Sequence, residues 1–147
     1  MNTPQKVSLV LLRVGIGIVF FYAGISKLLA DNWSAAGYLN SAQTFSGLYH
    51  WLASSGNIGW INFINIWGAI LIGGGLVLGF LTRWAAWAGV LLMVLYYFPV
   101  LHFPYVGEHS YLVDEHIVYI LVLSVIISLH AGRYIGIDGA LRSGRDR

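Results

Sequence analysis

Three ionisable side chains stand next to one another at the start of a long apolar run: Asp114, Glu115 and His116. Imidazole and carboxylate groups are the side chains that most often move protons in proteins. Ionisable groups at membrane depth are costly, so they usually face a partner or a wet cavity. For Asp114 we expect a capping role, because acidic residues are favoured at a helix N-terminus. For Glu115, one residue deeper, capping and a partner within the bundle both remain open.

Lys27 is the natural partner for these carboxylates. It lies near the far end of the first apolar run, whereas the other basic residues lie at or beyond the opposite ends of the runs. An ion pair of Lys27 with Glu115 or Asp114 would join the first run to the last. The alternative is that the lysine stem follows the helix until the ammonium group reaches the aqueous surface.

Four apolar runs must position these side chains, at about residues 7–29, 58–81, 84–101 and 111–130. Each is close to the roughly 17–25 residues that a helix needs to cross a bilayer. Of the 147 residues, 58% are hydrophobic and only 10% are charged, whereas a soluble domain is about one quarter charged. The sequence therefore predicts one all-α domain over residues 1–147, an integral membrane four-helix bundle in contact with the lipid bilayer.

The composition also argues against several kinds of protein. The formal net charge of +2 is too small to indicate a nucleic-acid partner. The chain contains no cysteine, which excludes disulfides, zinc–thiolate sites and dithiol redox chemistry. No pair of histidines has a tight ligand spacing such as HxH or HxxxH, so we predict no metal site.

The basic residues predict an orientation. With four spans, one side of the membrane receives both termini and all but one of the basic residues: Lys6, Arg13, Arg83, Arg133, Arg142, Arg145 and Arg147. The exception is Lys27. Because loops rich in lysine and arginine stay in the cytoplasm, we expect a multi-pass protein of the cytoplasmic membrane with both termini inside. Lys27, Glu115 and His116 would then lie toward the outer side.

The connector at about residues 32–56 is long enough to form structure of its own. Its apolar residues recur at helical spacing: Ala42, Phe45, Leu48, Tyr49 and Leu52. This pattern predicts an amphipathic helical segment that lies in the outer interface or caps the bundle. Asn32 or Ser34 would cap a short helix there. An irregular surface loop is the alternative.

Small residues predict which helix faces pack together. In the first span a narrow stripe contains two glycines among larger side chains: Arg13, Gly17, Phe20, Gly24 and Lys27. In the second span Gly75 and Gly79 form a GxxxG pair, on a stripe that also includes Asn65 and Gly68. Such pairs allow helices to approach closely in a membrane. At the end of the last span, Gly132 is a plausible C-cap.

Aromatic and polar side chains gather at the predicted outer end and suggest an amphipathic pocket. We expect Glu115, His116 and Lys27 to carry its chemistry. The side chains expected to hold a ligand are Arg13, Tyr22, Trp33, Tyr38, Tyr96, Tyr97, His102 and Tyr119. A quinone needs an apolar slot, hydrogen bonds to its two oxygens and groups that exchange protons, and this set would supply them. The alternative is an aromatic belt with interhelical hydrogen bonds and no ligand.

Several motifs resemble those of the DoxX family of small membrane proteins. They lie at residues 12–15 (LRVG), 21–28 (FYAGISKL), 79–86 (GFLTRWAA) and 132–139 (GRYIGIDG). The resemblance covers nearly the whole chain in order. It implies a small four-helix membrane protein linked to quinone redox or sulfur oxidation.

A narrower likeness is to the DoxD-type subunit of thiosulfate:quinone oxidoreductase. It is carried by residues 35–39 (AAGYL) and 65–68 (NIWG). This likeness implies a membrane subunit that passes electrons from thiosulfate or another sulfur compound to quinone. Because the chain has no evident electron carrier, a second membrane or extracytoplasmic redox subunit is an expected partner. The alternatives are a non-catalytic accessory or assembly subunit of a larger respiratory complex and, more remotely, a small transporter or channel.

Overall fold

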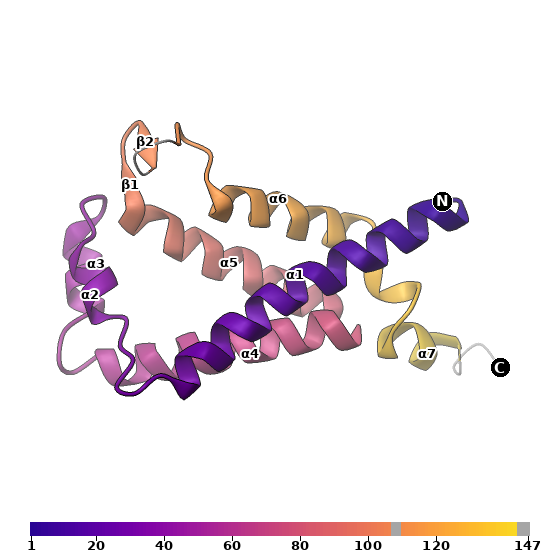
Figure 1. Cartoon of the computed structure of the whole chain (residues 1–147), viewed down its shortest axis with the longest axis horizontal. Helices are drawn as coiled ribbons and strands as arrows, with labels where there is room; N and C mark the ends of the chain where they lie inside the picture. Colours follow the sequence, from indigo (N-terminus) through magenta and orange to yellow (C-terminus); the bar gives the residue numbers. More distant parts are fainter. Residues whose placement is uncertain (107–109, 144–147) are drawn as a thin grey trace.

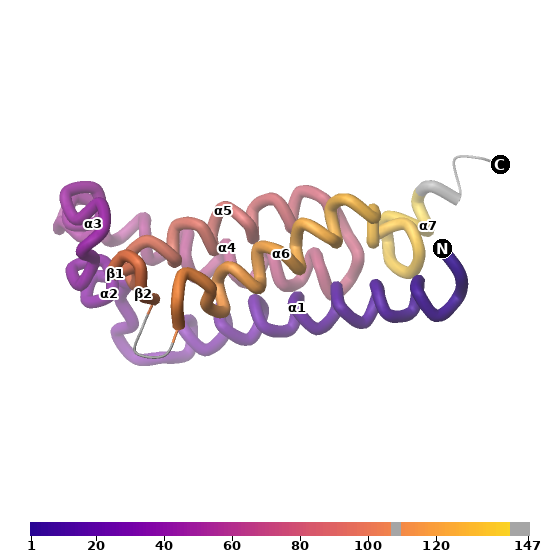
Figure 2. Tube along the Cα trace, turned by 90° about the horizontal axis from the view of Figure 1, so that it is seen from above, coloured from indigo at the N-terminus to yellow at the C-terminus, as the bar shows by residue number. Residues whose placement is uncertain are grey.

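The computed structural model describes residues 1–106 and 110–143, and it is mostly helical. Four helices run side by side along the long axis: α1 (Thr3–Leu29), α4 (Ile58–Leu78), α5 (Thr82–Val100) and α6 (Glu115–Ser128) (Figures 1 and 2). The short helices α2 and α3 lie at one end of this bundle, here named the α2 end. The N-terminus and α7 (Ile137–Ser143) lie at the other, here named the terminal end (Figure 1).

Three of the helices are long and apolar enough to cross a membrane: α1, α4 and α5. The prediction of four full-length spans is therefore confirmed only in part, since α6 has 14 residues and would measure about 21 Å at 1.5 Å per residue. A bilayer core is about 30 Å thick. Many large apolar side chains on the long helices are exposed, for example Leu11 at 66% and Leu71 at 70%, as expected for surfaces that contact lipid.

Helix α1 begins where its sequence provides a strong N-terminal signal. The side chain of Asn2 accepts a hydrogen bond from the backbone N–H of Gln5, and the Gln5 side chain accepts one from the N–H of Asn2. This reciprocal pair is a capping box. The predicted stripe on this helix is confirmed, since Arg13, Gly17, Phe20 and Gly24 are all buried.

Glycines bring α1 and α4 into close contact, but on α4 they are not the predicted ones. A Cβ atom on Gly73 would lie 2.3 Å from the backbone nitrogen of Phe21, and one on Gly24 would lie 2.8 Å from that of Ile70. The predicted GxxxG pair, Gly75 and Gly79, also lies at close contacts, but these are not with the backbone of α1. Gly75 instead faces the start of α5, and Gly79 ends α4 in a left-handed conformation with φ of 66°, which glycine adopts without steric cost.

A residue at the terminal end holds the turn between α4 and α5 in place by hydrogen bonds. The carboxylate of Asp138 accepts hydrogen bonds from the backbone N–H groups of Leu81 and Thr82, both at 2.9 Å. The N–H of Asp138 donates to the carbonyl of Gly79 at 2.8 Å. A residue of the C-terminal segment therefore satisfies donors at the start of α5 that no helical carbonyl can reach.

Helix α6 begins four residues later than the predicted span. Asp114 is its N-cap and accepts from the N–H groups of His116 and Ile117, which confirms the predicted capping role. The preceding residues belong to a small hairpin of β1 (Leu101–His102) and β2 (Tyr105–Val106), which Tyr111 extends by a bridge to Tyr105. Extended backbone cannot continue into the helix, so the apolar run is divided between two structures.

The end of α6 also differs from the prediction. The C-cap is Leu129 rather than Gly132, and His130 takes the left-handed conformation. Gly132 lies in the short helix η1 (Ala131–Arg133), where a Cβ atom would come within 2.6 Å of the Thr82 hydroxyl and 2.7 Å of the Asp138 carboxylate. Gly132 is thus needed for close packing against α5 and α7.

The predicted outer segment is helical, but it is broken into α2 (Ala36–Asn40) and α3 (Ser46–Leu52). The break falls where Phe45 adopts a left-handed conformation with φ of 53°. Ala42 and Tyr49 face inward as predicted, whereas Phe45 and Leu48 are exposed. The buried residues of this segment form a second small core with the ends of α4 and α5: Ala35, Leu39, Ala42 and Tyr49, packed against Ile58, Ile61 and Phe98 among others. The segment therefore caps the bundle.

Candidate functional site

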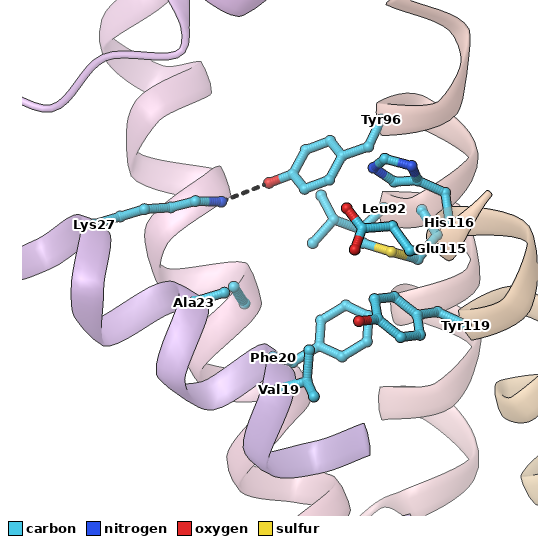
Figure 3. A pocket seen from close by; sticks show the side chains of 11 residues that line it. Val19, Phe20, Ala23, Lys27, Leu92, Tyr96, Glu115, His116 and Tyr119 are labelled. Carbon is cyan, nitrogen blue, oxygen red and sulfur yellow. Dashed lines mark hydrogen bonds between the residues drawn. The ribbon is translucent and has the colours of Figure 1, made fainter. Parts of the chain in front are cut away.

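A cavity of about 220 Å³ opens between α1, α4, α5 and α6 toward the α2 end of the bundle (Figure 3). Most of its wall is apolar, and Lys27, Tyr96, Glu115, His116 and Tyr119 contribute the polar groups. The apolar and small wall residues are Val19, Phe20, Ala23, Ala69, Leu92 and Met93. Figure 3 shows side chains of α1 on one side and of α6 on the other pointing toward the same space.

A second cavity, of about 380 Å³, continues from the first toward α2. The two share Lys27, Tyr96, Glu115 and His116 in their linings. The second adds polar and aromatic groups from the connector and α4: Trp33, Ser34, Tyr38 and Asn65. We treat both as one site, the Lys27 site, with an apolar chamber on the bundle side and a more polar chamber beneath α2.

The ammonium group of Lys27 is held by neutral partners. It donates to the side-chain oxygen of Asn65 at 2.7 Å and to the hydroxyl of Tyr96 at 2.9 Å. It also lies 5.1 Å from the centre of the Trp33 ring and 5.0 Å from that of Tyr96, within the range of a cation–π interaction. The hydroxyl of Tyr96 donates in turn to Asn65 at 2.5 Å, so one amide oxygen accepts from both side chains.

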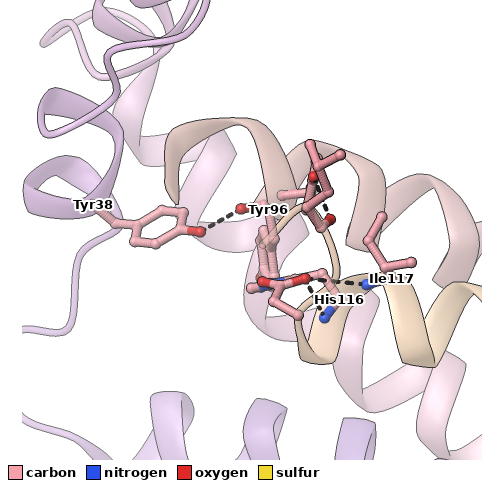
Figure 4. A network of polar contacts seen from close by, with 7 residues as sticks. Tyr38, Tyr96, His116 and Ile117 are labelled. Atoms are coloured by element: carbon pink, nitrogen blue, oxygen red, sulfur yellow. Dashed lines mark hydrogen bonds and ion pairs between the residues drawn. The ribbon is translucent and has the colours of Figure 1, made fainter. Parts of the chain in front are cut away.

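The predicted ion pair between Lys27 and a carboxylate is absent from the part of the chain that the structure describes. Asp114 is engaged instead with His116, whose Nδ1 lies 2.5 Å from a carboxylate oxygen (Figure 4). The Lys27 ammonium lies among Asn65, Tyr96 and Trp33, which leaves Glu115 as an exposed carboxylate on the wall of both chambers. The lysine also does not simply extend to the surface, since its side chain is only partly exposed.

The rings of His116 and Tyr96 complete the wall. Their centres are 6.1 Å apart in an edge-to-face arrangement, a favourable geometry for aromatic pairs. Because Asp114 engages Nδ1, the other imidazole nitrogen, Nε2, is the one left to exchange a proton. Lys27, Tyr96 and His116 thus follow one another along the site.

Pro99 explains how the α2–α3 segment is attached to this site. Proline has no N–H, so the carbonyl of Leu95 loses its helical donor, and the hydroxyl of Tyr49 donates to it at 2.9 Å. Beside it, the hydroxyl of Tyr38 donates to the backbone carbonyl of Tyr96 (Figure 4). Burial raises the pKa of both the Tyr38 and the Tyr49 phenol, because the charged form is poorly solvated there.

Most of the predicted site residues lie together. The structure brings seven of them to the Lys27 site: Lys27, Trp33, Tyr38, Tyr96, Glu115, His116 and Tyr119. The sequence did not single out Asn65 as a site residue, although it is a polar side chain within an apolar span and therefore carried a signal. The small and apolar wall residues, such as Ala23 and Ala69, carried none, because core residues have the same composition.

Four predicted residues lie elsewhere. Arg13 is 2% exposed and donates to the carbonyl of Ala131 at 3.1 Å, so it belongs to the terminal end. Tyr22 is 73% exposed on the surface of α1. Tyr97 donates instead to the carbonyl of Leu112 at 2.7 Å, and His102 is exposed on the hairpin. Tyr22 and Tyr97 thus point away from the site, whereas Arg13 shares the helix face of Lys27 but lies at the other end of α1.

The site has the composition of a small-molecule pocket rather than of a metal centre. Within residues 1–106 and 110–143, no three histidine or carboxylate side chains are grouped so that they could hold a metal ion. Apolar walls with a few convergent polar groups are typical of small-molecule sites. The polar groups here are hydrogen-bond donors and proton-exchanging side chains, which suit an apolar ligand that carries oxygen acceptors.

Fold and site together define a small multi-pass membrane protein with a pocket between its helices at the α2 end. Residues 8–102 match the DoxX family, and the chain belongs to that family. The match includes Lys27, Asn65 and Tyr96, whereas α6 with Glu115 and His116 follows it. No curated protein and no solved structure matches the chain.

Proposed function

We propose that this DoxX-family protein is a quinone-binding membrane subunit of a redox system. The observation that carries the proposal is the composition of the Lys27 site, an apolar chamber that ends in Lys27, Tyr96 and His116. A quinone combines an apolar ring and tail with two carbonyl oxygens, and these are the features that the walls and the polar end would recognise.

The residues of the site divide these tasks among them. Val19, Ala23 and Leu92 would contact the apolar body of the ligand. Lys27 and Tyr96 would donate hydrogen bonds to an oxygen, with Asn65 keeping both side chains in place. His116, oriented by Asp114, and the carboxylate of Glu115 would exchange protons with the aqueous side.

A bound quinone supplies redox chemistry, in which two electrons and two protons convert it to the quinol. The cysteine-free chain offers no dithiol to deliver those electrons. We therefore propose that they come from thiosulfate or another sulfur compound, through a membrane or extracytoplasmic partner subunit. The residues that suggested a DoxD-type subunit include Ala35, Tyr38 and Asn65, all of which line the Lys27 site.

Quinone binding is the first test. A short-chain quinone is titrated into the purified protein in detergent, and saturable quenching of tryptophan fluorescence is followed, because Trp33 lies within the site. We expect Lys27→Met to weaken binding about tenfold, as for the loss of a hydrogen bond from a charged donor. Lys6→Met, at the terminal end, is the matched control and should bind like the wild type. Quenching that does not saturate, or equal loss in both variants, would contradict the proposal.

Turnover is the second test. Thiosulfate-dependent quinone reduction is measured with the isolated chain and with the chain purified together with its native neighbours. Activity in the second preparation that Lys27→Met and Glu115→Gln reduce would support a redox subunit. If both variants lower only the yield of the complex and not the activity per complex, the protein is an accessory or assembly subunit instead.

A further inference from the structure

A pocket of about 230 Å³ lies at the terminal end of the bundle, on the opposite end from the Lys27 site. It forms where the start of α5 meets η1 and α7. Its polar lining consists of Thr82, Arg83, His130, Arg133 and Asp138, with Gly132 between them. Nothing in the proposed redox function uses this pocket.

Positive charge dominates the pocket. Arg83 from α5 and Arg133 from η1 both line it, together with His130. Asp138 is the one carboxylate of this lining, and its two oxygens already accept hydrogen bonds from the backbone of Leu81 and Thr82. Two guanidinium groups that line one pocket are a feature that binds phosphate in proteins.

A buried hydroxyl provides an independent observation. Thr82 is 3% exposed and lines the pocket, and its hydroxyl has no hydrogen-bond partner among the described residues. Buried polar groups nearly always have a partner, from the protein, from water or from a ligand. Because Thr82 lines the pocket, a group bound there would lie beside the residue that carries this unsatisfied hydroxyl.

The surroundings favour a lipid as the source of that group. Trp84, next to Arg83, is 74% exposed, and Ile135, two residues after Arg133, is 62% exposed. Both are exposed apolar side chains at the end of a membrane bundle, where aromatic belts and headgroups meet. Basic pockets between membrane helices bind anionic headgroups.

We propose that the pocket of Thr82, Arg83, His130 and Arg133 binds the phosphate of an anionic phospholipid headgroup. The two arginines hold the phosphate from adjacent elements, while Asp138 stays engaged with the start of α5. The bound lipid would tie α5 to η1 at the surface of the membrane. This inference does not depend on the redox function.

Native mass spectrometry of the purified protein with added phosphatidylglycerol or phosphatidylcholine tests the proposal. We expect the wild type to retain phosphatidylglycerol in preference to phosphatidylcholine. Arg133→Gln should weaken phosphatidylglycerol binding about tenfold, which corresponds to one lost charged hydrogen bond. Lys6→Gln removes the same charge from the same end outside the pocket and should change binding less than about twofold.

Three results would overturn the proposal. Equal binding of both lipids would show that the site does not select anionic headgroups. Equal loss in Arg133→Gln and Lys6→Gln would show a diffuse effect of surface charge. Displacement of phosphatidylglycerol by an equal concentration of inorganic phosphate would assign the pocket to the free anion rather than to the lipid.

A second variant tests the hydroxyl. Thr82→Val keeps the shape of the side chain and removes its donor, and we expect several-fold weaker phosphatidylglycerol binding with an unchanged far-ultraviolet circular dichroism spectrum. Wild-type binding by a folded Thr82→Val protein would overturn the role of this hydroxyl. Arg133 is exposed, so its substitution decides the proposal even where the buried threonine does not tolerate change.

Discussion

Asn65 holds the polar end of the Lys27 site in place. Its side-chain oxygen accepts from the Lys27 ammonium at 2.7 Å and from the Tyr96 hydroxyl at 2.5 Å. Lys27 also donates to the Tyr96 hydroxyl, but Asn65 is the acceptor that the two side chains share. Asn65 therefore orients the Lys27 ammonium and the Tyr96 hydroxyl, the two groups that could bind a ligand in the cavity.

Replacement of Asn65 tests this role. Asn65→Leu removes the shared acceptor, and we expect it to destabilise the protein by about 1–2 kcal/mol and to lower its apparent melting temperature in detergent. Asn65→Asp retains an oxygen acceptor and is the matched control, expected to remain close to the wild type. A melting temperature for Asn65→Leu equal to that of the wild type would contradict the shared-acceptor role.

The contact that Tyr38 makes between α2 and α5 should weaken at high pH. Its hydroxyl donates to the backbone of Tyr96, and burial raises its pKa above the usual value of 10.0. A phenol with a raised pKa contributes stability that is fully present below the unfolded pKa and is lost as pH rises toward the folded pKa. The contact should therefore weaken only in alkaline solution, above about pH 10.

Ultraviolet absorbance of tyrosinate measures this effect. The difference between the wild type and Tyr38→Phe should titrate above pH 10.0, later than an exposed tyrosine. A difference spectrum that titrates at or below the ordinary tyrosine value would show that the hydroxyl is not engaged with α5.

Helices α1 and α4 lie so close together that one added Cβ atom would not fit between them. Gly73 has backbone of α1 against it, since an added Cβ would meet the Phe21 nitrogen at 2.3 Å and the Gly17 carbonyl at 2.6 Å. Backbone cannot move aside as a flexible side chain does. Gly74, the next residue, has nothing within 4 Å of the same position.

This pair provides a matched substitution. Gly73→Ala should force α1 and α4 apart and destabilise the protein by about 2–3 kcal/mol, seen as a lower melting temperature and weaker ligand binding at the Lys27 site. Gly74→Ala should leave stability unchanged or slightly raised, because alanine favours helix more than glycine does. Equal effects of the two substitutions would show that the close α1–α4 approach does not occur.

The proline in α5 explains why α2 and α3 are attached to the end of that helix. Pro99 removes one donor near the end of the helix, and the tyrosines of α2 and α3 occupy the carbonyls of Leu95 and Tyr96. The last turns of α5 are therefore tied to the α2–α3 segment by these two hydrogen bonds. Tyr38 of α2 and Tyr96 of α5 both line the polar chamber of the Lys27 site.

For the whole molecule, the structure places the N-terminus and α7 at one end and α2 and α3 at the other (Figure 1). The basic residues predict that the terminal end faces the cytoplasm. The Lys27 site would then open toward the outer side, and the proposed phosphate pocket would face the inner leaflet. That leaflet carries most of the anionic lipid.

Single cysteines test this orientation, because the natural chain contains none. Asn2→Cys, at the terminal end, and Ser54→Cys, just after α3, are labelled in intact cells with a reagent that does not cross membranes. We expect labelling of the cysteine at position 54 and protection of the cysteine at position 2 until the cells are opened. The reverse result would place the Lys27 site on the cytoplasmic side.

Much of the site could be predicted from residue types alone. Lys27, Tyr96, Glu115 and His116 are polar groups at the ends of apolar runs, where burial without a partner is costly. The packed face of α1 followed from the helical repeat, because residues three and four apart share one side of a helix. Asp114 as a cap followed from its place before an apolar run.

Only the tertiary structure decided which faces meet. The helical repeat orders side chains around one axis, but it does not state which neighbouring helix lies against them. Lys27 therefore lies against the amide of Asn65 rather than a carboxylate, and Arg13 is buried at the terminal end. The hairpin likewise shortens α6, because Tyr111 pairs with Tyr105 through the backbone and cannot also be helical. The apolar composition of this run does not show which of its residues are helical and which are extended.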